Sequence, residues 1–203
     1  MAKICVFGDS IARGVDDRNG GGWAERLKMS LIKKGSGYDV YNLGISGNNT
    51  EDLIKRFHSE AEIRNPQIVV FFIGTNDSQF VDNLENHAVS EKKFKSNILF
   101  LADQAASINS KAVFLGIPSC DQERLMPAPW NPSKFYTEDS LRKYDRILKQ
   151  ACIEKSTDYL KTQGLYDPLS ETSDGLHPDS KGHEKLFRLV EDFVLNLPEI
   201  KNE

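Results

Sequence analysis

The chain has few cysteines, and their spacing predicts neither a disulfide framework nor a zinc site. Its 203 residues include only three, Cys5, Cys120 and Cys152, and no two of them form a Cys-x-x-Cys pair. An odd number of widely spaced cysteines is typical of free thiols in a reducing compartment. A chain of this length can bury a sizeable core without cross-links, so we expect one domain over residues 1–203.

Long apolar runs and a strong excess of one charge are also missing. No apolar stretch approaches the length of a membrane span, and a strand pattern begins at Ile4, which leaves no room for a signal peptide. The 26 Lys and Arg residues are interspersed with 30 Asp and Glu residues, giving a net charge of −4. This balance does not indicate a nucleic-acid surface. We therefore expect a soluble, cytoplasmic protein with no transmembrane segment and no nucleic-acid partner.

Short apolar runs alternate with segments of helical periodicity. The apolar runs predict strands at 4–7, 38–43, 67–73, 112–117 and, more weakly, 159–160. The periodic segments predict helices at 23–32, 90–107, 138–156 and 179–197. The run 67–73 is the most apolar, so we place it at the centre of the sheet. This alternation predicts an α/β fold, a doubly wound parallel sheet of about five strands with helices on both faces.

The longest stretch without periodicity spans 118–136. It is rich in proline and carries the large side chains of Met126, Trp130 and Phe135. Long irregular loops in compact domains are commonly functional. Together with residues 78–81, this segment is expected to determine substrate specificity. Its aromatic side chains either face a substrate or pack down as a lid on the core.

Residues suited to catalysis follow three of the predicted strands. Ser10 follows the first strand, Gly44 the second and Asn76 the third. Ligands of an open α/β sheet bind beyond the carboxyl ends of its strands, so we expect these three residues at one edge. A glycine lets a ligand approach its backbone N–H, and an asparagine amide is a neutral hydrogen-bond donor. Each segment taken alone could equally be a turn that closes a strand.

Asp174 and His177 lie three residues apart in a turn before the last predicted helix. Within such a turn the carboxylate can hold the Nδ1–H of the imidazole, which leaves Nε2 free to take a proton. His58 and His87 have polar surroundings, and His183 lies inside the helix, where we expect a structural role. The alternative for the pair is a simple cap before Pro178.

These residues together predict a serine hydrolase. A serine hydroxyl needs a base that is itself oriented by a third group, and the oxyanion that forms needs preorganised donors. The expected triad is Ser10, His177 and Asp174. The expected oxyanion hole consists of the N–H groups of Ser10 and Gly44 and the amide of Asn76.

The same residues resemble the signature of the SGNH hydrolase, or GDSL-type esterase, superfamily over essentially the whole chain. The matching positions are Ser10 for the nucleophile, Gly44 for the backbone donor, Asn76 for the side-chain donor, and Asp174 and His177 for the Asp-x-x-His pair. One departure is Ile11, where the family pattern has leucine. The resemblance implies a flavodoxin-like, three-layer α/β/α fold, a small-molecule ester as substrate, and neither a metal nor an organic cofactor.

The sequence therefore predicts an esterase or acylhydrolase that cleaves a carboxylic ester or thioester. One alternative is a non-catalytic ligand-binding module on the same fold, because fold does not fix function. Another is a metal-dependent phosphoesterase, since Gly-Asp-Ser at 8–10 echoes such a segment, although no Asp-x-His precedes Asp9. The sequence does not choose among lipid, thioester, aryl ester and acetylated carbohydrate substrates, and it does not indicate an oligomeric state.

Overall fold

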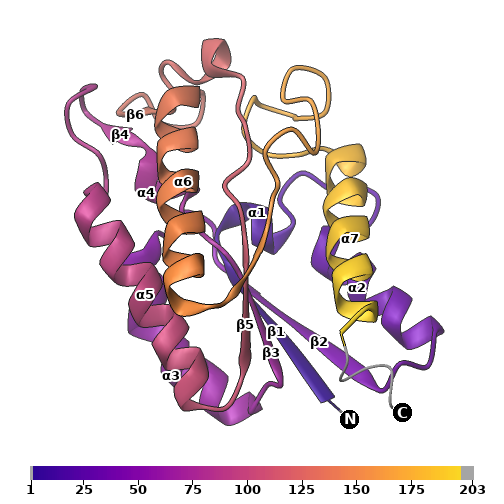
Figure 1. Cartoon of the computed structure of the whole chain (residues 1–203). Helices are drawn as coiled ribbons and strands as arrows, with labels where there is room; N and C mark the ends of the chain where they lie inside the picture. Colours follow the sequence, from indigo (N-terminus) through magenta and orange to yellow (C-terminus); the bar gives the residue numbers. More distant parts are fainter. Residues whose placement is uncertain (1, 198–203) are drawn as a thin grey trace.

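The computed structural model describes residues 2–197 and contains a five-stranded sheet between two layers of helices (Figure 1). In spatial order the strands are β2 (Tyr38–Gly44), β1 (Ala2–Gly8), β3 (Ile68–Phe72), β5 (Lys111–Leu115) and β7 (Asp158–Leu160). Every pairing in this sheet is parallel. This is the doubly wound, flavodoxin-like order, and it confirms the predicted fold class and the central position of the most apolar strand.

Each layer of helices covers one face of the sheet (Figure 1). Successive side chains of a strand point to opposite faces, so the apolar strands present an apolar surface to each layer. Helices α3 (Thr50–Arg64), α5 (Glu91–Ser107) and α6 (Glu138–Lys155) pack on the face that carries Phe7, Phe71 and Phe114. Helices α2 (Trp23–Lys33) and α7 (Ser180–Leu195) pack on the other face. The sheet is thus packed between two apolar cores, which hold the carboxyl ends of its strands in defined positions.

Helix α3 has no counterpart among the helices predicted from the sequence. Its apolar stripe is narrow, because Leu53, Phe57 and Ala61 are its buried apolar residues and the rest of the helix is largely charged. Its start is well defined. Asn49 accepts a hydrogen bond from the N–H of Asp52, and the Asp52 side chain accepts one from Asn49 in return. The cap was therefore a clearer signal for this helix than its periodicity.

The irregular segment 118–136 lies over the carboxyl ends of the strands. It contains the short 3-10 helix η1 (Gln122–Leu125) and the strand β6 (Lys134–Phe135). Strand β6 pairs antiparallel with β4 (Phe80–Val81), which follows the short helix α4 (Thr75–Ser78). This ribbon joins the connection after β3 to the connection after β5 (Figure 1). The two segments expected to determine specificity are thus in direct contact.

Cys5, Cys120 and Cys152 are all buried with free thiols. Within residues 2–197, no helix combines the length and the apolar character needed to cross a bilayer.

Candidate active site

Ser10 is the first residue of the short helix α1 (Ser10–Arg13), directly after β1. The carboxylate of Asp9 caps this helix by accepting the N–H of Ile11 at 2.9 Å. Because Ser10 opens the helix, its own backbone N–H has no acceptor inside the helix. Gly8 is needed just before it, since a Cβ there would lie 2.1 Å from the carbonyl oxygen of Phe72. Close packing of β1 against β3 therefore presents both the hydroxyl and the N–H of Ser10 at the sheet edge.

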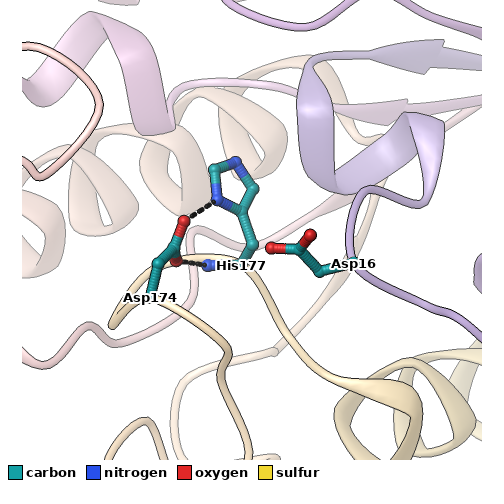
Figure 2. Close-up of side chains that lie close together, drawn as sticks. All are labelled: Asp16, Asp174 and His177. Atoms are coloured by element: carbon teal, nitrogen blue, oxygen red, sulfur yellow. Dashed lines mark hydrogen bonds and ion pairs between the residues drawn. The ribbon is translucent and has the colours of Figure 1, made fainter.

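His177 and Asp174 lie in the turn that precedes α7. The imidazole Nε2 is 2.8 Å from Ser10 Oγ, and Nδ1 is 2.6 Å from Asp174 Oδ2. The other carboxylate oxygen of Asp174 accepts the backbone N–H of His177 at 2.8 Å (Figure 2). Gly175, with φ of 96°, allows the turn to close on itself. The structure thus brings the predicted serine, histidine and aspartate into one hydrogen-bonded line.

The surroundings of this pair stabilise its charged form. Burial lowers the pKa of His177, but the hydrogen bond and charge of Asp174, with the charges of Asp9 and Asp16, outweigh burial and raise it above the ordinary value. Burial raises the pKa of Asp174, but its hydrogen bond to His177 and the imidazole charge outweigh burial and lower it. A strengthened imidazole base beside a hydroxyl is what proton abstraction from serine requires.

A third carboxylate, Asp16, lies beside the histidine–aspartate pair (Figure 2). Ligand atoms of Asp16, Asp174 and His177 lie within 4.8 Å of one another, a spacing that could suit a metal ion. These atoms already have partners, however. His177 is bonded to Asp174 and Ser10, and Asp16 accepts a hydrogen bond from the hydroxyl of Ser173. Both ring nitrogens of His177 are therefore engaged, by Asp174 and by Ser10, and neither is left as a ligand for a metal ion.

Asn76 lies in α4, at the carboxyl end of β3, and is buried. Its Nδ2 donates to the carbonyl oxygen of Asn48 at 3.0 Å, and its Oδ1 accepts the hydroxyl of Tyr136 at 3.0 Å. The amide nitrogen carries a second hydrogen, which remains for a ligand in the cleft that Asn76 lines. Asn76 thus lines the same cleft as Ser10 and His177.

Gly44 differs from its sequence-predicted role as a free N–H donor. It ends β2 opposite Gly8, and its N–H donates to Oδ1 of Asn42 at 3.0 Å. A Cβ at this position would lie 2.4 Å from the backbone nitrogen of Arg13. Gly44 is thus required for close packing of β2 against α1, and its N–H is engaged elsewhere.

Gly47, three residues further on, lines the cleft in its place. Its φ is 83°, in the left-handed region, and among residues 2–197 no backbone group accepts a hydrogen bond from its N–H. The sequence contains both glycines in the segment after β2. Only the backbone path distinguishes the glycine that reaches the cleft, and the sequence does not reveal that path.

A cleft of about 320 Å³ opens beside Ser10. Three of its lining residues come from the irregular segment: Trp130, Lys134 and Tyr136. Trp130 is 43% exposed and its ring centroid is 5.2 Å from that of His177, whereas Tyr136 is buried. Trp130 therefore borders the cleft beside His177, whereas Tyr136 lines the cleft and also packs into the core.

Arg56 is a contributor that sequence reasoning missed. From α3, its Nε donates to Oδ1 of Asn48 at 2.9 Å and its Nη2 donates to the carbonyl of Gly8 at 3.2 Å. Its guanidinium also lies over the ring of Phe7, 5.7 Å from the centroid. Arg56 thus connects Gly8, which precedes Ser10, to Asn48, whose carbonyl accepts the Asn76 amide. Because α3 itself was not predicted, nothing in the sequence marked this arginine.

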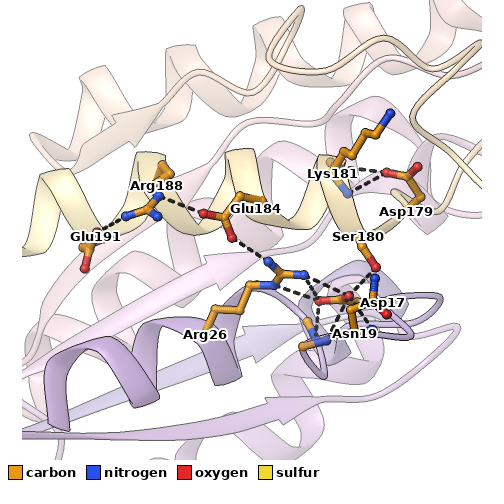
Figure 3. Close-up of polar contacts among 12 residues, drawn as sticks. Asp17, Asn19, Arg26, Asp179, Ser180, Lys181, Glu184, Arg188 and Glu191 are labelled. Atoms are coloured by element: carbon orange, nitrogen blue, oxygen red, sulfur yellow. Dashed lines mark hydrogen bonds and ion pairs between the residues drawn. The ribbon is translucent and has the colours of Figure 1, made fainter. Parts of the chain in front are cut away.

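The loop after α1 is anchored to α2 and α7 by a buried carboxylate (Figure 3). Asp17 accepts hydrogen bonds from Arg26 at 2.9 and 3.0 Å and from the hydroxyl of Ser180 at 2.7 Å. Arg26 also pairs with Glu184 of α7.

His183 is fully buried in the same region, and its Nε2 donates to the carbonyl of Val15 at 3.0 Å. These contacts position the start of α7, just after the turn that carries His177.

The chain is similar in sequence to known esterases and acylhydrolases. The family described as "GDSL-like Lipase/Acylhydrolase family" matches residues 6–185. The human protein "Isoamyl acetate-hydrolyzing esterase 1 homolog" is 26% identical, over 97% of this chain and 84% of its own length. "Esterase TesA" of Pseudomonas aeruginosa is 24% identical, over 92% of this chain and 85% of its own length.

The fold is similar to that of a solved structure, the lipase/acylhydrolase from Enterococcus faecalis. The TM-score is 0.77, with 24% identity, and the similarity covers 96% of this chain and 95% of that one. At this identity the similarity supports the fold alone. The matched family region contains Ser10, Asn76, Asp174 and His177.

Proposed function

The chain belongs to the GDSL-like lipase/acylhydrolase family, and from that premise we propose that it is a serine esterase in which Ser10, His177 and Asp174 form the triad. The observation that carries the proposal is the line from Asp174 Oδ2 to His177 Nδ1, 2.6 Å, and from His177 Nε2 to Ser10 Oγ, 2.8 Å. Distances of this size allow a proton to move between serine and imidazole without rearrangement of the backbone.

The reaction proceeds in two steps. His177 Nε2 takes the proton of Ser10 as Oγ attacks the ester carbonyl carbon, and Asp174 stabilises the imidazolium that forms. The tetrahedral intermediate collapses, the ester C–O bond breaks, and His177 returns the proton to the leaving alcohol. Water then attacks the acyl-enzyme and gives its proton to His177. The acid leaves, and Ser10 regains its hydrogen.

The oxyanion of each tetrahedral intermediate accepts hydrogen bonds from three donors. We assign these to the backbone N–H of Ser10, the Nδ2 of Asn76 and the backbone N–H of Gly47, which replaces Gly44 in the role predicted from the sequence. Gly47 is supported by its place in the cleft and by its N–H, which lacks a backbone acceptor among residues 2–197. Preorganised donors of this kind act mainly on the transition state.

We propose small esters with a short acyl group as the substrate class. The cleft, at about 320 Å³, is at the small end of the range of about 300–1,000 Å³ typical of ligand pockets. One of the relatives is named for hydrolysis of isoamyl acetate, an ester with a two-carbon acyl group. A cytoplasmic location stays a prediction from the sequence.

The test is hydrolysis of 4-nitrophenyl esters of increasing acyl length by the wild type and by Ser10→Ala, each with and without EDTA. We expect turnover that is highest for the acetate, falls with chain length, is lost in Ser10→Ala and is unchanged by EDTA. Loss of activity with EDTA would support the metal-dependent phosphoesterase. A folded wild type that turns over none of the esters would support a binding module.

A further inference from the structure

We propose that Tyr136 is a positioning residue of the oxyanion hole, whose hydroxyl holds the Asn76 amide with Nδ2 toward the reacting carbonyl. The inference rests on the proposed esterase function and adds a residue to it. Tyr136 follows β6 in the irregular segment, and its side chain is 1% exposed. Its hydroxyl lies 3.0 Å from Oδ1 of Asn76 and 2.9 Å from Oε1 of Gln79.

The Asn76 amide is held at both ends. Its Nδ2 donates one hydrogen to the carbonyl of Asn48, and its Oδ1 accepts the hydroxyl of Tyr136. A single contact at Nδ2 would still let the amide plane rock about that bond. The second contact at Oδ1 fixes the plane, and with it the direction of the remaining N–H. An oxyanion donor lowers the barrier most when its direction is set before the reaction.

The hydroxyl of Tyr136 is suited to this role because it remains a donor. Burial raises the pKa of Tyr136 further above its ordinary value, so the proton stays on the oxygen across the range in which His177 titrates. The hydroxyl has one proton and two neighbouring acceptor oxygens. If the Gln79 amide turns its Nε2 toward the hydroxyl, it donates to Tyr136, whose proton is then committed to Asn76. Such a chain polarises the Asn76 amide and strengthens its N–H as a donor.

The position of Tyr136 also links specificity to catalysis. The residue lies directly after β6, whose pairing with β4 joins the two segments over the cleft. Its ring centroid is 6.1 Å from that of Trp130, which borders His177. One hydroxyl thus connects the segment over the cleft to the amide of Asn76.

The test is Tyr136→Phe, which removes the hydroxyl and keeps the ring. We expect kcat for 4-nitrophenyl acetate to fall roughly tenfold with KM nearly unchanged, as for loss of one hydrogen bond that acts in the transition state. The matched control is Tyr144→Phe, because Tyr144 is also fully buried and its hydroxyl donates to a backbone carbonyl, that of Val89, outside the cleft. This control should lose stability but retain kcat. All variants are assayed below their own melting temperatures.

A double variant separates positioning from general destabilisation. If Tyr136 acts through Asn76, Tyr136→Phe should change kcat little when it is added to Asn76→Ala, because the amide is already absent. An equal fall in both backgrounds, or an unchanged kcat in Tyr136→Phe alone, would overturn the proposal. Labelling of Ser10 by a fluorophosphonate, measured in parallel, reports on the esterase proposal. Wild type that labels at Ser10 while Tyr136→Phe keeps full kcat would overturn the positioning role alone.

Discussion

The imidazole Nε2 of His177 lies 2.8 Å from Oγ of Ser10, although the two residues are 167 positions apart in the sequence. Ser10 follows the first strand, and His177 precedes the last helix. The contact exists only when β1 and α7 are both docked on the sheet. The proposed triad therefore forms only in the complete fold.

Replacement of Asn76 by alanine removes a side-chain donor from the proposed oxyanion hole. We expect kcat to fall on the order of 10²–10³-fold with KM nearly unchanged, because the lost hydrogen bond acts on the transition state. Steady-state kinetics on 4-nitrophenyl acetate measure both constants. A raised KM at normal kcat would instead make Asn76 a substrate-binding residue.

Gly44 and Gly47 should respond differently to substitution by alanine. In Gly44→Ala the new Cβ would lie 2.4 Å from the backbone of Arg13, so we expect a large loss of stability. In Gly47→Ala the Cβ meets no atom within 4 Å, but φ of 83° strains the backbone and shifts the N–H. We therefore expect a folded protein with reduced kcat.

The matched control for Gly47→Ala is Gly164→Ala. Gly164 has φ of 75° and also leaves its Cβ in open space, but it does not line the cleft. Thermal unfolding should show losses of similar size in both variants, roughly 1 kcal/mol. Only Gly47→Ala should lose kcat. Equal kcat in the two variants would remove Gly47 from the oxyanion hole.

The pH dependence of kcat/KM should follow His177. Its raised pKa means that the imidazole gains a proton, and the rate falls, at a pH above the ordinary histidine value of about 6.5. Asp174→Asn removes the charge that raises this pKa, so the acid limb should move to lower pH and the rate should drop. His183→Gln keeps a donor for Val15 and should retain both the rate and the acid limb. Folded but inactive His183→Gln would show that the wrong histidine was assigned.

Arg26 should be important for stability rather than chemistry. The side chain of Asp17 is fully buried against it, so Arg26→Met leaves a buried carboxylate without its cation and should cost roughly 3–5 kcal/mol. Adding Asp17→Asn should recover part of that loss. The control is Arg142→Met, since Arg142 is 58% exposed beside Glu138 and should cost at most about 1 kcal/mol. Urea unfolding curves measure all of these variants, and equal losses for Arg26 and Arg142 would contradict the account.

The sequence predicts Asp174 and His177 from their spacing in a turn before the last helix, whereas it predicts the sheet and the placement of Ser10 and Asn76 at one edge for another physical reason. Apolar runs mark buried parallel strands, and the carboxyl ends of such strands meet at one edge. Polar residues that follow neighbouring strands, as Ser10 and Asn76 follow β1 and β3, therefore lie near one another despite their separation in the sequence.

The parts that could not be predicted depend on details of the backbone path. Helix α3 buries a narrow stripe, so its periodicity is weak and Arg56 was missed with it. Gly44 and Gly47 are chemically identical, and only the left-handed turn after β2 brings Gly47 to the cleft. Tyr136 comes from a segment without periodicity, whose contact with Asn76 exists only once β4 and β6 have paired.

The most direct test of the central claim is to identify the residue that a fluorophosphonate modifies. Wild-type protein is labelled, digested and analysed by mass spectrometry, with Ser10→Ala and His177→Ala as the variants and circular dichroism as the folding check. We predict one adduct, on Ser10, that is absent from Ser10→Ala and forms much more slowly in His177→Ala. An adduct on another serine in folded Ser10→Ala, or labelling of His177→Ala at the wild-type rate, would contradict the account.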